Sequence, residues 1–130
     1  MAARTTIDEL LAQARAGLAR VEAHEVPDAI SGGALLIDIR SESQRAADGF
    51  VPDAIWFARN VLEWRCDPSC EAHDDRVGGL ERRVIVMCDE GYQSSLAAAT
   101  LQQLGFAAAT DLVGGFRAWR AAGLPVTPAS

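Results

Sequence analysis

VIVMCDEGYQSS, residues 84–95, joins four apolar residues to a polar loop and then to an alanine-rich segment. The short apolar run predicts a buried strand over residues 84–87. The alanines predict a helix from Ser94 or Ser95 to Leu104, ended by Gly105. Cys88 would then lie at a strand's carboxyl end, facing a helix N-terminus whose unpaired N–H groups and positive dipole stabilise a thiolate or persulfide. Since the thiolate is the reactive form of cysteine, Cys88 is the predicted nucleophile.

Helix and strand patterns alternate along the rest of the chain. Further strands are expected at residues 35–39, 55–58 and 108–113, with a short one near 20–23. Helices are expected after Thr6, from Pro27 to Gly32, from Ser41 to Asp48 and from Phe116 to Ala122. This alternation predicts an α/β fold, with an open, mainly parallel central sheet flanked by helices on both faces. The 130 residues fit a single domain, 1–130, in which residues 1–20 form an N-terminal helical extension packed on it.

Composition narrows the classes of function. The formal net charge of -6 and a pI near 4.8 argue against a nucleic-acid-binding surface. No apolar run reaches the roughly 18 residues of a membrane span, and the N-terminal residues lack a hydrophobic signal core. We therefore expect a cytoplasmic protein without nucleic-acid or membrane partners.

Several charged residues and glycines are expected to gather around Cys88, because the carboxyl ends of parallel strands meet at one edge of a sheet. Asp38 and Arg40 end one strand, and a structural ion pair or loop-bracing role is favoured over direct chemistry for both. Arg59 follows another strand and either supplies positive charge to the loop or is a solvated surface residue. Gly114 and Gly115 are expected to permit a tight turn near the cysteine.

Three motifs, in order, resemble signatures of the rhodanese family of sulfurtransferases. They are Leu36-Ile37-Asp38-Ile39-Arg40 with Gly49, Pro52 and Ala54; Cys88 with Gly91 and Ser94; and Leu112-Val113-Gly114-Gly115-Phe116 with Trp119, Gly123, Pro125 and Val126. The tail motif is the most specific of the three. Together the motifs make residues 21–126 similar to a single-domain rhodanese.

The resemblance implies a sulfurtransferase that moves a sulfane sulfur from thiosulfate or a persulfide to a thiol or cyanide acceptor through a Cys88 persulfide. It implies small-molecule partners, with a sulfur-accepting protein as a further acceptor, and neither a metal nor an organic cofactor. The expected active-site loop consists of Asp89, Glu90, Gly91, Tyr92, Gln93 and Ser94. Its backbone N–H groups could form a nest for the persulfide, and Ser94 or Ser95 could add a hydroxyl donor or cap the helix.

The loop departs from the family pattern in its charges. Gln93 stands where most catalytic rhodaneses have arginine, and Asp89 and Glu90 replace basic residues. Two negative charges beside the nucleophile oppose a thiolate and an anionic donor. The sequence therefore predicts poor use of thiosulfate. Other departures are Phe50, Asp53 and Gln44.

Alternative functions stay open at this point. One is a non-catalytic or weakly catalytic rhodanese-like module for protein binding or for redox or sulfide sensing. A cysteine phosphatase is disfavoured, because its loop needs an arginine six positions after the cysteine and this chain has Ser94 there. Cys66, Cys70 and His73 lie in a polar segment read as a surface loop, residues 65–76. Plain loop cysteines are favoured over a redox pair with Cys88 or an incomplete zinc site.

Overall fold

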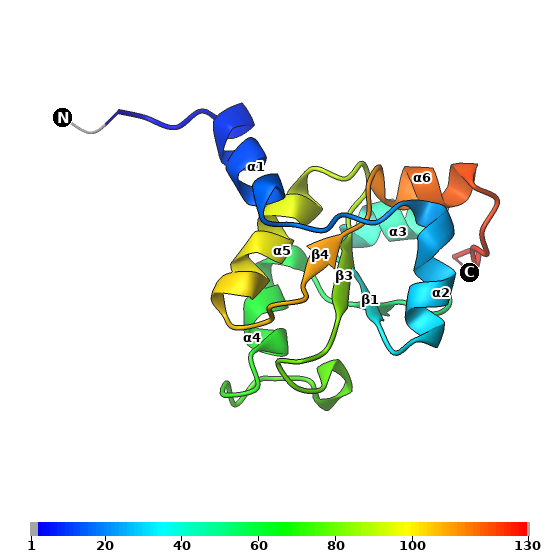
Figure 1. Cartoon of the computed structure of the whole chain (residues 1–130). Coiled ribbons are helices and arrows are strands. Elements are labelled where there is room, and N and C mark those ends of the chain that lie inside the picture. Colours follow the sequence, from blue (N-terminus) through cyan, green and yellow to red (C-terminus); the bar gives the residue numbers. More distant parts are fainter. Residues whose placement is uncertain (1–2, 130) are drawn as a thin grey trace.

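The central sheet has four strands, and every pair of neighbouring strands is parallel (Figure 1). The structure is a computed structural model that describes residues 3–129. The strands are β1 (Leu35–Asp38), β2 (Ile55–Trp56), β3 (Val84–Met87) and β4 (Thr110–Asp111), in the spatial order β2-β1-β3-β4. Every residue of β1 and β3 is buried, because these inner strands are covered on both faces. The predicted fold class is thereby confirmed.

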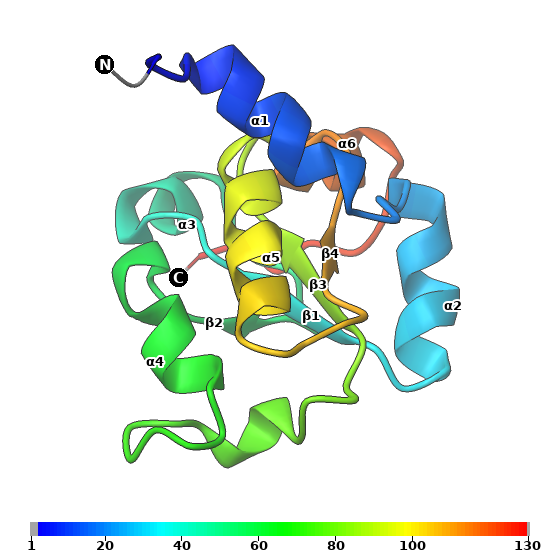
Figure 2. The same cartoon turned by 60° about the vertical axis from the view of Figure 1, so that its left-hand side comes forward.

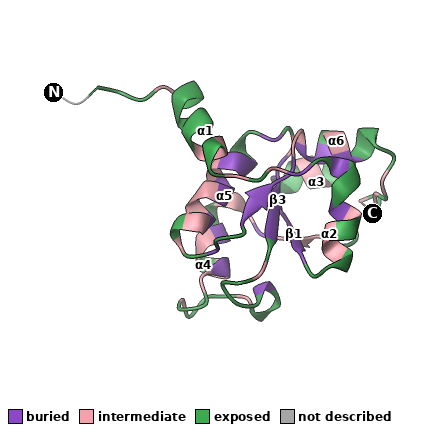
Figure 3. Cartoon of the chain, in the orientation of Figure 1, coloured by how far each residue is buried: buried purple, intermediate pink, exposed green. Residues whose placement is uncertain are grey.

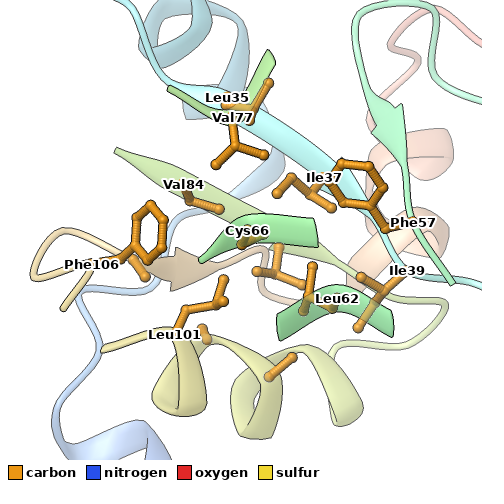
Figure 4. Close-up of a cluster of buried hydrophobic side chains, with 14 of the residues drawn as sticks. Leu35, Ile37, Ile39, Phe57, Leu62, Cys66, Val77, Val84, Leu101 and Phe106 are labelled. Atoms are coloured by element: carbon orange, nitrogen blue, oxygen red, sulfur yellow. The ribbon is translucent and has the colours of Figure 1, made fainter. Parts of the chain in front are cut away.

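Helices cover both faces of this sheet (Figures 2 and 3). The α-helices of the described residues are α1 (Ile7–Ala16), α2 (Val26–Ser31), α3 (Glu42–Asp48), α4 (Leu62–Cys66), α5 (Gln93–Gln103) and α6 (Gly115–Ala121). Side chains of α4 and α5, such as Leu62 and Leu101, pack on one face against Ile37 and Val84 (Figure 4). Side chains of α2 and α6 pack on the other. Within residues 3–129, no helix combines the length and the apolar character needed to cross a membrane.

Local side-chain contacts explain where α1 and α3 begin. The Thr6 hydroxyl accepts the Glu9 N–H at 3.1 Å before α1, and the Ser41 hydroxyl accepts the Gln44 N–H at 3.1 Å before α3. Gly49 ends α3 with a φ of +84°, a conformation that favours glycine. Both predicted helix starts are confirmed.

Helix α1 lies beside α5 (Figure 2). The Gln102 side-chain amide in α5 donates to the Gly17 carbonyl oxygen at 3.0 Å, directly after α1. This contact supports the prediction that residues 1–20 extend a single domain, which stays a prediction for the chain as a whole.

Some predicted elements differ from the observed ones. The strand expected near residues 20–23 reduces to one bridge between Val21 and Leu112, because Ala23–Glu25 turns into a 3-10 helix. The expected strands at 55–58 and 108–113 each contain two strand residues. The segment 65–76, expected as a surface loop, begins inside α4, where Cys66 is buried. Helix α5 starts at Gln93, before Ser94.

Candidate active site

Cys88 is the first residue after β3 and lies beside the end of β1. The Ile39 N–H donates to the Met87 carbonyl oxygen at 2.9 Å, so the two chain segments stay adjacent one residue beyond the strands. Cys88 is 7% exposed and lines an open cavity of about 250 Å³. The other lining residues are Ile39, Arg40, Gln44, Asp89, Glu90, Tyr92 and Gln93. The nucleophile predicted from the sequence is therefore accessible through a small cavity at the sheet's carboxyl edge.

Two backbone N–H groups of the loop point at the sulfur of Cys88. The Gly91 N–H donates to Sγ at 3.1 Å, and the Ser94 N–H donates at 3.3 Å. Gly91 has a φ of +87°, and a Cβ there would lie 2.6 Å from the Gly114 nitrogen. The lack of a side chain thus lets the loop turn its N–H groups inward. Such donors stabilise negative charge on the sulfur.

The start of α6 holds the loop from the opposite side. The Phe116 N–H donates to the Cys88 carbonyl oxygen at 2.8 Å, and the Arg117 N–H donates to that of Asp89 at 3.1 Å. A Cβ on Gly115 would overlap the Cys88 carbonyl oxygen and lie 2.8 Å from the Asp89 carbonyl carbon. The turn at Gly114 and Gly115 therefore lies against the Cys88 loop, as the sequence analysis predicts.

The charge of Asp89 is neutralised by a cation that the sequence did not point to. Arg117 Nε lies 2.8 Å from Asp89 Oδ2, and this hydrogen bond raises the pKa of Arg117. Glu90 is exposed, and its carboxylate lies 3.9 Å from the same nitrogen. The sequence places two negative charges, Asp89 and Glu90, beside Cys88, and the structure adds that Arg117 from α6 pairs with the first of them.

A buried carboxylate, Asp111 of β4, organises the back of the loop. It accepts hydrogen bonds from the Ser94 hydroxyl at 2.7 Å and the Ser95 hydroxyl at 2.8 Å. It also pairs with Arg20, whose Nε lies 2.9 Å from Oδ1. Both serine hydroxyls are engaged with Asp111, and α5 has no side-chain cap. The expectation that these hydroxyls serve the sulfur or cap the helix was therefore wrong.

Two arginines before residue 22 reach the same loop. Arg15 Nη2 donates to the Gly91 carbonyl oxygen at 2.8 Å, and Arg20 Nη2 donates to it at 3.0 Å. Arg15 Nε also donates to the Ser95 hydroxyl at 3.0 Å. The charged Asp111 inside a predicted strand is one weak sequence signal for this network, and no signal points to the two arginines.

Asp38 and Arg40 form a buried ion pair at the end of β1. Arg40 Nη2 lies 2.9 Å from Asp38 Oδ2 and donates to the Gly49 carbonyl oxygen at 2.8 Å. The guanidinium lies 3.8 Å from the centre of the Phe116 ring, which belongs to the opposite core cluster from Cys88. This geometry supports the favoured brace role, because it ties β1 to the chain after α3.

Arg59 lies outside the Cys88 cavity. It pairs with Glu63 at 2.8 Å, one helical turn later, and lines a neighbouring cavity of about 380 Å³ that shares Ile39 and Arg40 with the first. Its charge is thus opposed by Glu63, which argues against the idea that it supplies positive charge to the loop.

The other two cysteines lie in different environments. Cys66 is buried in the core, and its burial, with Glu63 and Asp74 nearby, raises the pKa of its thiol to about 12. Cys70 lies in a turn after α4, and the His73 ring bonds to the Cys70 carbonyl oxygen and to Asp75. Residues 3–129 contain no group of three or more His, Cys, Asp or Glu side chains placed to hold a metal ion.

Comparisons of sequence and structure give several proteins that this chain is similar to. A curated sulfurtransferase from Allochromatium vinosum is 32% identical over 92 residues, which span 71% of this chain and 77% of that protein. A structure from Rhodopseudomonas palustris, of unknown function and described as a possible tyrosine phosphatase, has a TM-score of 0.87 at 25% identity and covers 98% of both chains. A human single-domain sulfurtransferase has a TM-score of 0.65 at 26% identity, covering 78% of this chain and 95% of its own. The family model for the rhodanese-like domain matches residues 22–122, and the chain belongs to this family.

Proposed function

We propose that this chain is a sulfurtransferase that carries a sulfane sulfur as a persulfide on Cys88. The observation that carries the proposal is the pair of N–H groups, from Gly91 and Ser94, at 3.1 and 3.3 Å from Sγ at the edge of an accessible cavity. These groups stabilise the thiolate before attack and the persulfide after it. Family membership supports the same reaction class.

The reaction proceeds in two displacements on sulfur. In the first, the Cys88 thiolate attacks the outer sulfur of the donor, a new S–S bond forms, and the donor's S–S bond breaks. The leaving group, sulfite from thiosulfate or a thiolate from a persulfide, departs with the electron pair. In the second, a thiol or cyanide attacks the outer sulfur of the Cys88 persulfide and restores the Cys88 thiolate. No external oxidant or reductant is consumed.

The charges around the cavity favour a persulfide donor over thiosulfate. Arg40, the arginine among the lining residues, is paired with Asp38, and Glu90 brings a negative charge to the rim. Gln93 places a neutral amide where a cation would attract the dianion. The reacting group of a thiol persulfide carries at most one negative charge, against two on thiosulfate, and therefore meets less repulsion next to Cys88. A sulfur-accepting protein remains a candidate partner in the second displacement.

A phosphatase is the competing enzyme, because the Rhodopseudomonas palustris structure is described as a possible one. Phosphoryl transfer through cysteine needs a cation that clamps the phosphate oxygens. Ser94 stands at that position in this chain, and its hydroxyl is bound to Asp111. Sulfur transfer, which requires no such clamp, fits the loop better.

The experiment compares Cys88→Ser with a matched Cys70→Ser variant in transfer from glutathione persulfide to cyanide. We expect the first variant to lose transfer completely while keeping the unfolding temperature of the second, because only the nucleophile is removed. The second variant should turn over like the wild type. Wild-type transfer by Cys88→Ser would refute the assignment, and absence of transfer in the wild type would favour the alternative of a rhodanese-like binding or sensing module.

A further inference from the structure

We propose that Arg15 and Arg20 are positioning residues for the Cys88 loop, and that they fix the orientation of the N–H groups that bind the sulfur. Both donate to one atom, the Gly91 carbonyl oxygen, at 2.8 and 3.0 Å. We call this pair of contacts the arginine clamp. This role of Arg15 and Arg20 in sulfur transfer rests on the function proposed above.

The clamp acts on the residue whose N–H contacts the sulfur. Gly91 is held on both of its peptide units, since its N–H donates to Cys88 Sγ and its carbonyl oxygen accepts from two guanidinium groups. Glycine at a φ of +87° has a large conformational range of its own. With the carbonyl oxygen fixed outward by two charge-assisted bonds, the N–H on the other side of the residue is kept pointing at the sulfur.

Arg15 ties several parts of the loop together. Its Nε donates to the Ser95 hydroxyl at 3.0 Å, and its guanidinium lies 5.4 Å from the centre of the Tyr92 ring, which is on the rim of the cavity. The Ser95 hydroxyl in turn donates to Asp111. One side chain from α1 therefore contacts the loop at its middle and at the first turn of α5.

Arg20 joins the clamp to the buried carboxylate. It makes a bidentate contact with Asp111 at 2.9 and 3.2 Å, and its side chain is 19% exposed. Asp111 also binds the Ser94 hydroxyl, and the Ser94 N–H is the second donor to the sulfur. Both N–H donors are thus connected through this network to the arginines.

The clamp lies outside the part of the chain that the family model describes. That model matches residues 22–122, whereas Arg15 and Arg20 belong to α1 and to the segment that follows it. Gln93, inside the match, provides no cation to the loop. The N-terminal segment therefore supplies cations behind the loop and not in the cavity. From behind the loop, the two arginines can orient its N–H groups without binding the sulfur donor.

The test uses Arg15→Met and Arg15→Lys in the full chain, with Arg4→Met, at an exposed residue before α1, as a control of equal charge change. Alkylation of Cys88 by iodoacetamide is followed against pH and assigned by peptide mapping. We expect the alkylation profile of Arg15→Met to move to higher pH than that of Arg4→Met. In transfer from glutathione persulfide to cyanide, kcat should fall about tenfold while KM stays within about twofold, because Arg15 does not line the cavity. Arg15→Lys, which keeps the charge, should recover part of both effects.

The outcomes separate this inference from the proposed function. Alkylation needs no sulfur donor, so a shifted profile in a protein without transfer activity would support the clamp and contradict only the function. If Arg15→Met and Arg4→Met have the same alkylation profile, the clamp is refuted whatever the activity of the wild type. A lower unfolding temperature without a shift in the profile would also refute it, since that result describes a purely structural residue.

Discussion

Replacing Gly115 by alanine tests whether the turn before α6 positions the Cys88 loop. Gly115 has a φ of +60°, and a Cβ there would overlap the Cys88 carbonyl oxygen and lie 2.8 Å from the Asp89 carbonyl carbon and oxygen. Because these are backbone atoms, no side chain can move aside to make room. The loop or the helix must shift instead.

The geometry sets the size of the expected losses of stability and of sulfur transfer in Gly115→Ala. Ordinary contact begins near 3.4 Å, so separating the new Cβ from Asp89 alone needs a shift of about 0.6 Å, and the overlap with Cys88 needs more. A left-handed alanine costs about 1–2 kcal/mol, and losing the Phe116–Cys88 backbone hydrogen bond costs about 1 kcal/mol. We expect Gly115→Ala to lower the free energy of unfolding by about 2–3 kcal/mol. Sulfur transfer should fall at least about tenfold, because sub-ångström displacement of a nucleophile is enough for this.

Gly123→Ala is the matched control. Gly123 has a φ of +74°, but a Cβ there would meet nothing within 4 Å. Gly123→Ala should therefore lower the free energy of unfolding only by the cost of a left-handed alanine, about 1–2 kcal/mol, as measured by urea denaturation. Its transfer of sulfur from glutathione persulfide to cyanide should be normal. If both variants transfer sulfur at equal rates, the reasoning that α6 fixes the loop is refuted.

Two further predictions concern charge and ionisation. Gln93→Arg should raise kcat/KM for thiosulfate about tenfold relative to Gln93→Met, because it adds the missing cation to the cavity; equal values in steady-state assays would remove the electrostatic argument. The pKa of the Cys66 thiol is raised from 9.0 to about 12, so the folded state keeps its proton while the unfolded state loses it, and the free energy of unfolding should fall as pH rises from 9 towards 12. Cys66→Ala should reduce this fall in urea denaturation at increasing pH, and an identical pH dependence in the two proteins would contradict the assignment.

Much of the fold could be predicted because its signals are local. The apolar run forms β3 itself, and Ser41 caps α3 by binding a backbone N–H only three residues later, so both signals lie within a few residues of the element they determine. The lengths of β2 and β4 and the bridge at Val21 depend on pairing between distant segments, which a local pattern does not contain. Cys66 was misplaced because the residues after it are polar, while its own side chain faces the core from the end of α4.

In the candidate site too, local features could be predicted from the sequence and contacts between distant segments could not. Cys88 and the glycines at 91, 114 and 115 could be found from the loop and the tail motif alone. The partners of the loop could not, since Arg15 and Arg20 contact Gly91 across 76 and 71 residues of sequence. The pairing of Asp89 with Arg117 spans 28 residues and changes the local charge that the sequence implied. Charges near a nucleophile therefore have to be counted in space.

The mass of the intact protein after exposure to glutathione persulfide tests the central claim most directly. We predict a gain of one sulfur atom, mapped to the Cys88 peptide and removed by cyanide with formation of thiocyanate. The Cys88→Ser variant should show no gain under the same conditions. A wild-type protein that gains no sulfur on Cys88, or one whose added sulfur maps to Cys70 and is retained in the presence of cyanide, would contradict the account.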